Sequence, residues 1–258
     1  LRSSGLAFSQ PLTLAVRLYE IRHRMSKKLR DHVVESTQVE LKNNLDKVVK
    51  KCRFIMRWIE KNIDRTERRI VLFNLLVATA DYLELTKSSL NSHISALALS
   101  TRSIYEINVR LRSLIENQEN LGKWQSEAVT DKVQVLEGIL LLANNSENLK
   151  EQNILKQEIE RLNGLVTKYG LPTIKQPIST GNLAKTVGLE NEHNALFKLY
   201  SKLVHPSSYL VNDYNGAASI ENQKILQIHA QLYAYDSISI ICEALEVPYE
   251  VSKPYGQA

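Results

Sequence analysis

The chain has 258 residues and a net charge of +5, and its apolar content of 43% is enough for a substantial hydrophobic core. Its 9 glycines and 6 prolines are too few for a β-sandwich or β-barrel, in which turn residues recur about every ten positions. The longest apolar run, GILLLA, is far below the roughly 20 residues of a membrane-spanning helix. These features predict an all-α protein in the cytoplasm with no membrane partner.

Apolar residues recur with the period of an α-helix along most of the chain. The segment 67–90 is apolar on most sides near its centre, which predicts a central, buried helix. We expect an up-and-down bundle of seven or eight helices with short connections. The predicted helical segments are 11–32 continuing as 33–63, then 67–90, 91–117, 118–145, 147–169, 182–187, 190–205 and 220–245.

Capping and helix-breaking residues mark several boundaries. Asp64 or Thr66 can cap the helix that begins at 67, and Asn145 or Ser146 the helix that begins at 147. Gly170 suits the position just after a helix, and the prolines of YGLPTIKQPISTGN prevent that helix from continuing. This stretch and HPSSYLVNDYNGAAS are therefore expected to be loops.

Positive charge is concentrated near the N-terminus. Residues 17–69 hold 16 Lys or Arg against 8 Asp or Glu, a balance of +8, and the remainder holds 17 against 20, a balance of −3. We interpret residues 1–65 as a basic helical arm, either separate or part of the same domain, and residues 66–258 as the bundle core. The basic segment predicts a surface for RNA or another nucleic acid, and an ordinary solvated helix face is the alternative.

A row of charged residues lies in ALSTRSIYEINVRLRSLIEN. Arg102, Glu106 and Arg110 recur at i, i+4 and i+8, which places them on one helix face. Such a row can be a surface ion ladder worth roughly half a kcal/mol per pair. The small residues Ser100 and Ser103 could instead admit another helix beside a partly buried Arg–Glu pair, which would present a guanidinium to a phosphate or carboxylate.

A second segment of interest is LYSKLVHPSSYLVND, in which a helical pattern reaches His205 and is stopped by Pro206. The helix dipole favours the protonated form of a histidine at a helix C-terminus, and the pKa of histidine is easily moved across neutrality. Ser207 and Ser208 could hydrogen-bond the imidazole or cap exposed backbone groups. The segment fits a proton-transfer group and a histidine that only caps the helix end equally well.

Other chemistries lack a pattern in this sequence. The remaining histidines have no metal-ligand spacing, and neither a P-loop nor a GxGxxG motif is present, so we expect no metal and no cofactor. Cys52 and Cys242 form no CxxC motif and no disulfide framework, which indicates a reducing compartment. The chain begins LRSSGLAFSQ, without methionine or a signal-peptide pattern, and we interpret this as the start of a fragment.

The two motifs together resemble those of a family of uncharacterised bacterial all-helical proteins. TRSIYE supplies Arg102 and Glu106 of an Arg-x3-Glu motif, and LYSKLVHPS supplies Tyr200 and His205 of a Tyr-x4-His-Pro-Ser motif. The resemblance covers about residues 65–245 and departs at Lys202, where the family carries serine.

That family in turn resembles HEPN helical domains, which include metal-independent ribonucleases of toxin–antitoxin and phage-defence systems. The resemblance implies a HEPN-like core, a homodimer and either RNA or a cognate protein as partner. It also implies His205 as the base for a ribose 2′-hydroxyl and Arg102 as the phosphate clamp. Glu106 and Tyr200 would join them in catalysis, and the binding residues would be Lys202, Ser207, Ser208 and Arg110.

The local HEPN signature, Arg-x4-6-His, is imperfect here. The nearest version at His205 is Lys198-x6-His205, and the formal match Arg17-x5-His23 lies within a predicted helix. Three functions therefore stay open: a defence ribonuclease, a non-catalytic interaction or regulatory module in which the Arg/Glu/Tyr/His cluster is a structural lock, and nucleic-acid binding by the basic N-terminal helices. The first two require the helix of Arg102 to lie near Tyr200 and His205.

Overall fold

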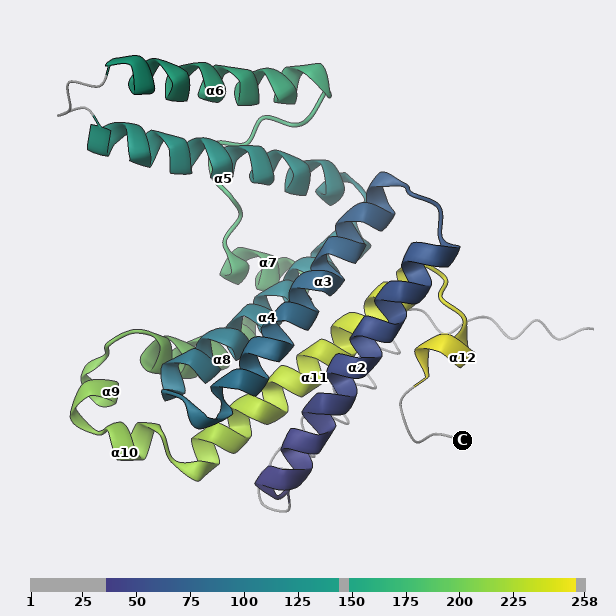
Figure 1. Cartoon of the computed structure of the whole chain (residues 1–258), viewed down its shortest axis with the longest axis vertical. Helices are drawn as coiled ribbons and strands as arrows, with labels where there is room; N and C mark the ends of the chain where they lie inside the picture. The colour runs from purple at the N-terminus through teal and green to yellow at the C-terminus, as the bar shows by residue number, and fades with distance from the viewer. Residues whose placement is uncertain (1–35, 144–148, 254–258) are drawn as a thin grey trace, which may run out of the picture.

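The structure, a computed structural model, describes residues 36–143 and 149–253, which contain helices and no strand. The all-α class and the helical bundle are confirmed (Figure 1). The predicted helix over residues 11–32 and the predicted caps at 145 and 146 lie outside the described residues. The elements are α2 (Gln38–Asn62), α3 (Glu67–Ser88), the 3-10 helix η1 (Ser89–Asn91), α4 (Ile94–Glu116), α5 (Glu119–Ala143), α6 (Leu149–Lys168), α7 (Thr180–Thr186), α8 (Glu190–Val204), α9 (Ser208–Asn212), α10 (Tyr214–Ala217), α11 (Ile220–Ala244) and α12 (Tyr249–Ser252).

Local hydrogen bonds explain where several helices begin and end. The Thr66 hydroxyl accepts a hydrogen bond from the Arg69 backbone N–H at 3.1 Å, which makes Thr66, one of the two predicted candidates, the cap of α3. Gly170 follows α6 with a φ of +60°, and the next residue, Leu171, donates its N–H back to the Val166 carbonyl at 2.9 Å. This closure of the helix end favours glycine because a side chain is strained at positive φ.

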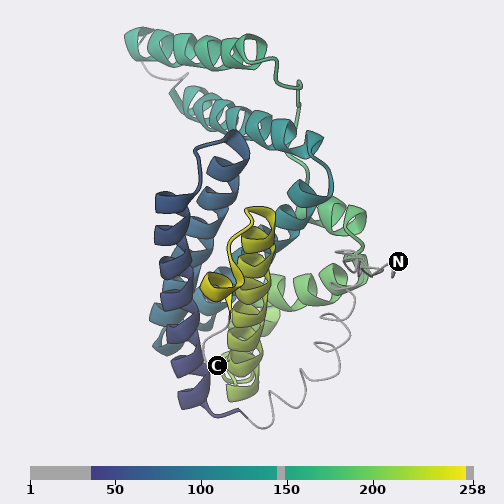
Figure 2. The ribbon, with the colours of Figure 1, turned by 90° about the vertical axis from the view of Figure 1, so that its right-hand side faces the viewer.

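Four long helices, α2, α3, α4 and α11, pack together and form most of the hydrophobic core (Figures 1 and 2). The centre of α3 is buried, as its apolar pattern predicts, and α11 lies against all three other helices. Helix α2 belongs to this core through its apolar stripe of Leu45, Val48, Cys52, Ile55 and Ile59. The described part of the basic segment therefore packs with the bundle, and residue 65 lies in the short connection between α2 and α3.

The stretch HPSSYLVNDYNGAAS differs from the expected loop because it contains two short helices, α9 and α10. Ser207 and Asp213 cap them: the Ser207 hydroxyl accepts from the Leu210 N–H at 3.2 Å, and an Asp213 carboxylate oxygen accepts from the Gly216 N–H at 3.0 Å. Serine and aspartate are common in loops and also strong N-caps, so composition alone did not separate the two outcomes.

Helices α5 and α6 form the predicted antiparallel pair and lie together at one end of the bundle (Figures 1 and 2). They pack mainly against each other, and α4 anchors the first turns of α5. None of the described helices combines the length and the apolar character that crossing a bilayer requires.

Candidate functional site

The centre of the molecule holds a buried cluster of tyrosines and histidines, which we call the Tyr–His cluster. It consists of Tyr105 on α4, His193 and Tyr200 on α8, and His229 and Tyr233 on α11. The rings of Tyr105 and Tyr233 meet edge-on with centroids 5.0 Å apart, and the centroids of Tyr105 and Tyr200 are 6.2 Å apart. Three helices are thus joined through one set of aromatic contacts.

Hydrogen bonds run through the Tyr–His cluster. The Tyr105 hydroxyl shares a hydrogen bond with Nδ1 of His193, and the Tyr200 hydroxyl shares one with Nδ1 of His229, each at 3.2 Å. The Tyr233 hydroxyl donates to the Glu192 carboxylate. Each phenol is therefore satisfied inside the fold, as buried hydroxyls must be to avoid a desolvation cost of about 1–3 kcal/mol.

Burial sets the protonation of these groups. It lowers the pKa of His229 to about 4, and it raises the pKa of Tyr200 and of Tyr233 well above the ordinary value. Burial also lowers the pKa of His193, with the nearby Glu106 carboxylate acting in the opposite direction and Arg102 adding to the decrease. Burial thus favours the neutral forms of these two histidines and two tyrosines, which suits a packed core.

The Arg-x3-Glu motif lies at the edge of this cluster. Nε of Arg102 is 2.8 Å from Oε1 of Glu106, and the Arg102 guanidinium lies 4.5 Å from the centre of the Phe197 ring on α8. The Arg102 and Glu106 side chains are 22% and 33% exposed, so the pair is partly buried, which was one of the two interpretations of the sequence. The guanidinium is held on one side by the carboxylate and on the other by an aromatic face.

Arg110, the third residue of the charged row on α4, contacts side chains of α5. Its guanidinium is 2.9 Å from the buried Glu127 carboxylate and 4.5 Å from the centre of the Trp124 ring. It also donates to the Ile178 carbonyl at 3.3 Å, while the Ile178 N–H donates to Glu127 at 3.2 Å. Arg110, predicted as a binding residue, thus fastens the base of the α5–α6 pair to α4 and to the connection before α7.

A second polar group that the sequence analysis did not single out joins α4 to α11. The Asn108 amide donates to Oδ2 of Asp236 at 2.6 Å and to the Ser237 hydroxyl at 3.1 Å. Arg112 is 2.5 Å from the same carboxylate oxygen, and its Nε donates to the Asn108 amide oxygen at 3.0 Å. The side chains of Arg112 and Asp236 are 13% and 5% exposed. Asn108 and Arg112 are four residues apart, and this spacing is the feature of the sequence that could have identified the group.

The His205 segment lies on the surface. His205 and Pro206 are exposed, and His205 ends α8 in an extended conformation with its N–H donating to the Ser201 carbonyl at 3.4 Å. The Ser207 hydroxyl donates to the Lys202 carbonyl at 2.7 Å, and Ser208 accepts from the Asn212 amide at 3.1 Å. These contacts are made by the His205 backbone N–H and by the two serine hydroxyls, and Lys202 and Ser208 are both exposed.

The structure brings only part of the predicted site together. Helices α4 and α8 do pack, and Tyr105 of the TRSIYE motif neighbours Tyr200. His205, however, is eight residues beyond Phe197, the α8 residue that Arg102 contacts, or about 12 Å along a helix axis. The histidines beside Tyr105 and Tyr200 are His193 and His229. His193, Phe197 and Tyr200 recur at i, i+4 and i+7, a helical stripe that could have identified His193.

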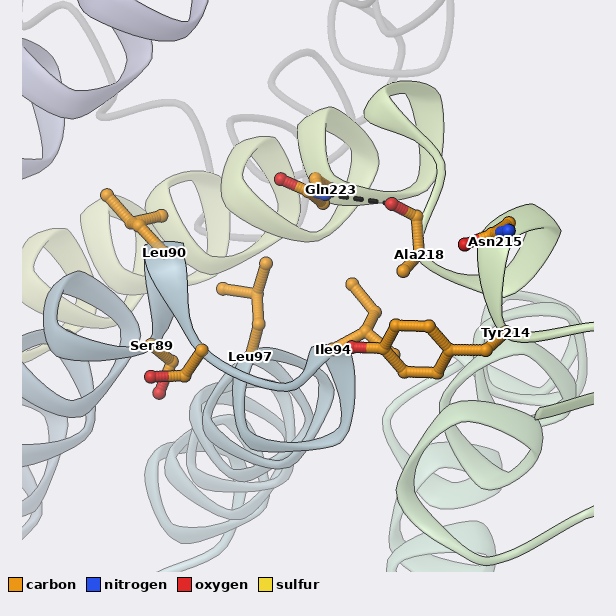
Figure 3. Close-up of a pocket in the computed structure, with 9 residues that line it drawn as sticks. Ser89, Leu90, Ile94, Leu97, Tyr214, Asn215, Ala218 and Gln223 are labelled. Atoms are coloured by element: carbon orange, nitrogen blue, oxygen red, sulfur yellow. Dashed lines mark hydrogen bonds between the residues drawn. The ribbon is translucent and has the colours of Figure 1, made fainter. Parts of the chain in front are cut away.

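A hollow of about 290 Å³ opens near the start of α4, beside the contact between the rings of His93 and Tyr214 (Figure 3). It contains no charged residue and none of the predicted site residues. Its lining residues are Ser89, Leu90, Ser92, Ile94, Leu97, Tyr214, Asn215, Ala218 and Gln223. Among the described residues, no group of three or more His, Cys, Asp or Glu side chains is arranged to hold a metal ion.

The fold and these contacts define a helical bundle protein with a polar cluster in its core. The chain belongs to the family of unknown function DUF5677, which matches residues 83–223, more than half of its length. The match spans α4 to α10, including Arg102, Tyr105, His193 and His205, and ends before His229 and Asp236. Neither a search of curated proteins nor a search of solved structures found a match.

Proposed function

We propose that this protein is a non-catalytic helical interaction module in which the Arg102–Glu106 pair and the Tyr–His cluster lock α4, α8 and α11 together. One observation supports this most directly. The polar side chains of the cluster are partnered with one another in the interior, where His193 is bound by Tyr105 and His229 by Tyr200. Histidine and tyrosine side chains that bind one another in the interior stabilise the fold, whereas a catalytic base needs access to the proton that it removes.

The ribonuclease alternative keeps His205 as the base and Arg102 as the phosphate clamp, within a HEPN-like core. It requires both groups to reach one phosphate. Among the described residues, Arg102 faces Glu106 and Phe197 while His205 is exposed at the end of α8. A partner subunit or a bound RNA would have to bring them together, and for this reason we rank this alternative second.

Melting and RNA cleavage separate the two proposals. Arg102→Ala removes the ion pair and the contact with Phe197, and we expect a loss of about 1 kcal/mol in the free energy of unfolding. For a chain of this size this corresponds to a fall in melting temperature of roughly 2–4 °C. His205→Ala should leave the melting temperature unchanged, because the side chain is exposed.

Incubation of the wild-type protein with mixed RNA completes the test. We expect intact RNA over a range of pH and salt. Cleavage by the wild type that disappears in His205→Ala, with both proteins equally stable, would overturn the interaction module and establish the ribonuclease.

The exposed face of α2 supports a further candidate, nucleic-acid binding. Lys50, Phe54, Arg57 and Lys61 recur at i, i+4, i+7 and i+11, so they share one helix face, and all four are solvent-exposed. Cations beside an exposed aromatic ring form a surface on which a single strand can lie, with phosphates on the cations and a base on the ring.

The change of the binding constant with salt concentration tests this binding. For a single-stranded RNA, the double variant Lys50→Gln and Arg57→Gln should reduce the slope of log K against log salt by about 1.4, or 0.7 for each lost phosphate contact. The matched control is Lys150→Gln and Lys156→Gln on α6, where both lysines are exposed. Equal slopes for the two variants would exclude α2 as the binding surface.

A further inference from the structure

The far half of the α5–α6 pair has apolar side chains on its surface. We call this region the hairpin tip and define it as residues 135–142 of α5 and 149–154 of α6. Six aliphatic side chains there expose between 47% and 86% of their surface. They are Val135, Ile139, Leu141 and Leu142 on α5, and Leu149 and Ile154 on α6.

The bundle does not use these side chains. The buried residues of α5 and α6 are Ser126, Glu127, Gln152 and Leu162. Contacts of α5 with the body of the protein involve its first half, through Trp124, Glu127 and Thr130. The hairpin tip therefore extends past the point where the fold holds the pair, as both views of the ribbon show (Figures 1 and 2).

The size of the tip matches one half of an interface. Full burial of one aliphatic side chain stabilises by about 1.5–3 kcal/mol, and each Å² of buried apolar surface contributes about 25 cal/mol. One such side chain therefore removes roughly 60–120 Å² of apolar surface from water. Six side chains that are about two-thirds exposed therefore offer roughly 250–500 Å², which is comparable to the largest apolar patch on a typical monomer, about 300–600 Å². Two such patches and their polar margins approach the roughly 1,200 Å² of the smallest specific interfaces.

Gly138 lies in the middle of the apolar stripe on α5. Glycine inside an exposed helix costs about 1 kcal/mol relative to alanine. A methyl group at this position would meet nothing within 4 Å in the single chain. The bundle therefore does not require a glycine here, whereas a second helix that crosses at Gly138 could approach closely.

The charges around the tip favour a second copy of this chain as the occupant. The exposed charged residues in and beside the tip have both signs in equal number: Asp131, Lys132, Glu137, Lys150, Glu151 and Lys156. A rim of this kind neither repels an identical surface nor attracts an anionic lipid or nucleic acid. Two hairpins related by a two-fold axis would form a four-helix bundle, in which the apolar faces of all four helices meet.

We propose that the hairpin tip is a homodimer interface, in which two α5–α6 pairs form a four-helix bundle with Val135, Gly138, Ile139 and Leu142 of each chain facing its partner. The inference rests on the proposed role as an interaction module and names its partner. It does not depend on the Tyr–His cluster, because the two regions share no contact residue.

Mass measurement tests the interface on the full chain. We expect the wild-type protein at micromolar concentration to have a mass in analytical ultracentrifugation of twice the 29.4 kDa of one chain. The double variant Ile139→Glu and Leu142→Glu should have the mass of a monomer. Both side chains are exposed in the single chain, so the variant should keep its helical circular dichroism. The matched control is Val39→Glu on α2, which is 68% exposed and should leave the dimer intact.

Two further variants make the result specific. Gly138→Ala should weaken the dimer, although alanine favours an isolated helix. Ile139→Cys should form a disulfide-linked dimer under mild oxidation at pH 8. The two native thiols should not interfere, because they are buried and burial raises the pKa of both Cys52 and Cys242 to about 12.

The outcomes are distinct. A wild type that stays monomeric, or a dimer that survives the double glutamate variant, overturns the interface and leaves the melting results for Arg102 and His205 unaffected. A monomer that binds neutral phosphatidylcholine vesicles through the tip also overturns it, with a lipid surface as the occupant.

Discussion

Between α4 and α11, an asparagine, an arginine and an aspartate lie in the interior of the bundle; at the hairpin tip, six aliphatic side chains lie in solvent. Buried polar groups are costly unless each finds its partner, and here Asp236 is held by both Asn108 and Arg112. Exposed aliphatic side chains have no such compensation within one chain. The comparison separates a region whose side chains are partnered within the chain from one that, on our proposal, is completed by a second copy.

Removal of a charge from the interior should give the largest effect. In Asp236→Ala, Arg112 is left without its carboxylate at a largely buried position, and we expect a loss of about 3–5 kcal/mol in the free energy of unfolding. Urea denaturation measures it. The matched variant is Glu158→Ala on α6, whose ion pairs with Lys132 and Arg161 lie at the surface and should contribute no more than about 1 kcal/mol. Equal losses would remove the distinction between the two regions.

The second-largest effect is expected from low pH, which should lower the free energy of unfolding. Burial lowers the pKa of His229 to about 4, against about 6.5 in the unfolded chain, so the unfolded state binds more protons between these values. Stability is therefore full above about pH 6.5 and is lost as the pH falls toward 4, by up to about 3 kcal/mol. Urea denaturation at a series of pH values measures the slope, which His229→Gln should reduce. An unchanged slope in that variant would show that other groups cause it.

Removal of one hydroxyl from the Tyr–His cluster should give the smallest of the three effects. Tyr200→Phe leaves Nδ1 of the buried His229 without its partner and should lower the free energy of unfolding by about 1–3 kcal/mol. Tyr209→Phe is the control, because Tyr209 is 41% exposed. Thermal melting compares the two. A loss in Tyr209→Phe as large as that in Tyr200→Phe would contradict a special role for the buried hydrogen bond.

Residue patterns located the long helices and one contact at the edge of the Tyr–His cluster. The apolar period gave α3, α4, α8 and α11 to within a few residues, and Thr66 gave the start of α3. The Arg102–Glu106 pair was predictable because a spacing of four residues on a helix fixes the distance between side chains. The partners of Tyr200 were not, since His229 lies 29 residues away in the chain and reaches it only when α8 and α11 both pack on α4.

The amino-acid sequence by itself determined what is local: helix positions, caps, and the neighbours at i+4. These follow from backbone geometry and from hydrogen bonds that close within a few residues. Only the tertiary structure decided that Arg110 pairs with Glu127, that His193 and His229 rather than His205 meet the tyrosines, and that the aliphatic side chains of the hairpin tip are exposed among the described residues. The physical reason is that the burial of a side chain and the choice of its hydrogen-bond partner depend on how separate helices pack. The sequence of a single helix does not determine which neighbour covers each of its faces.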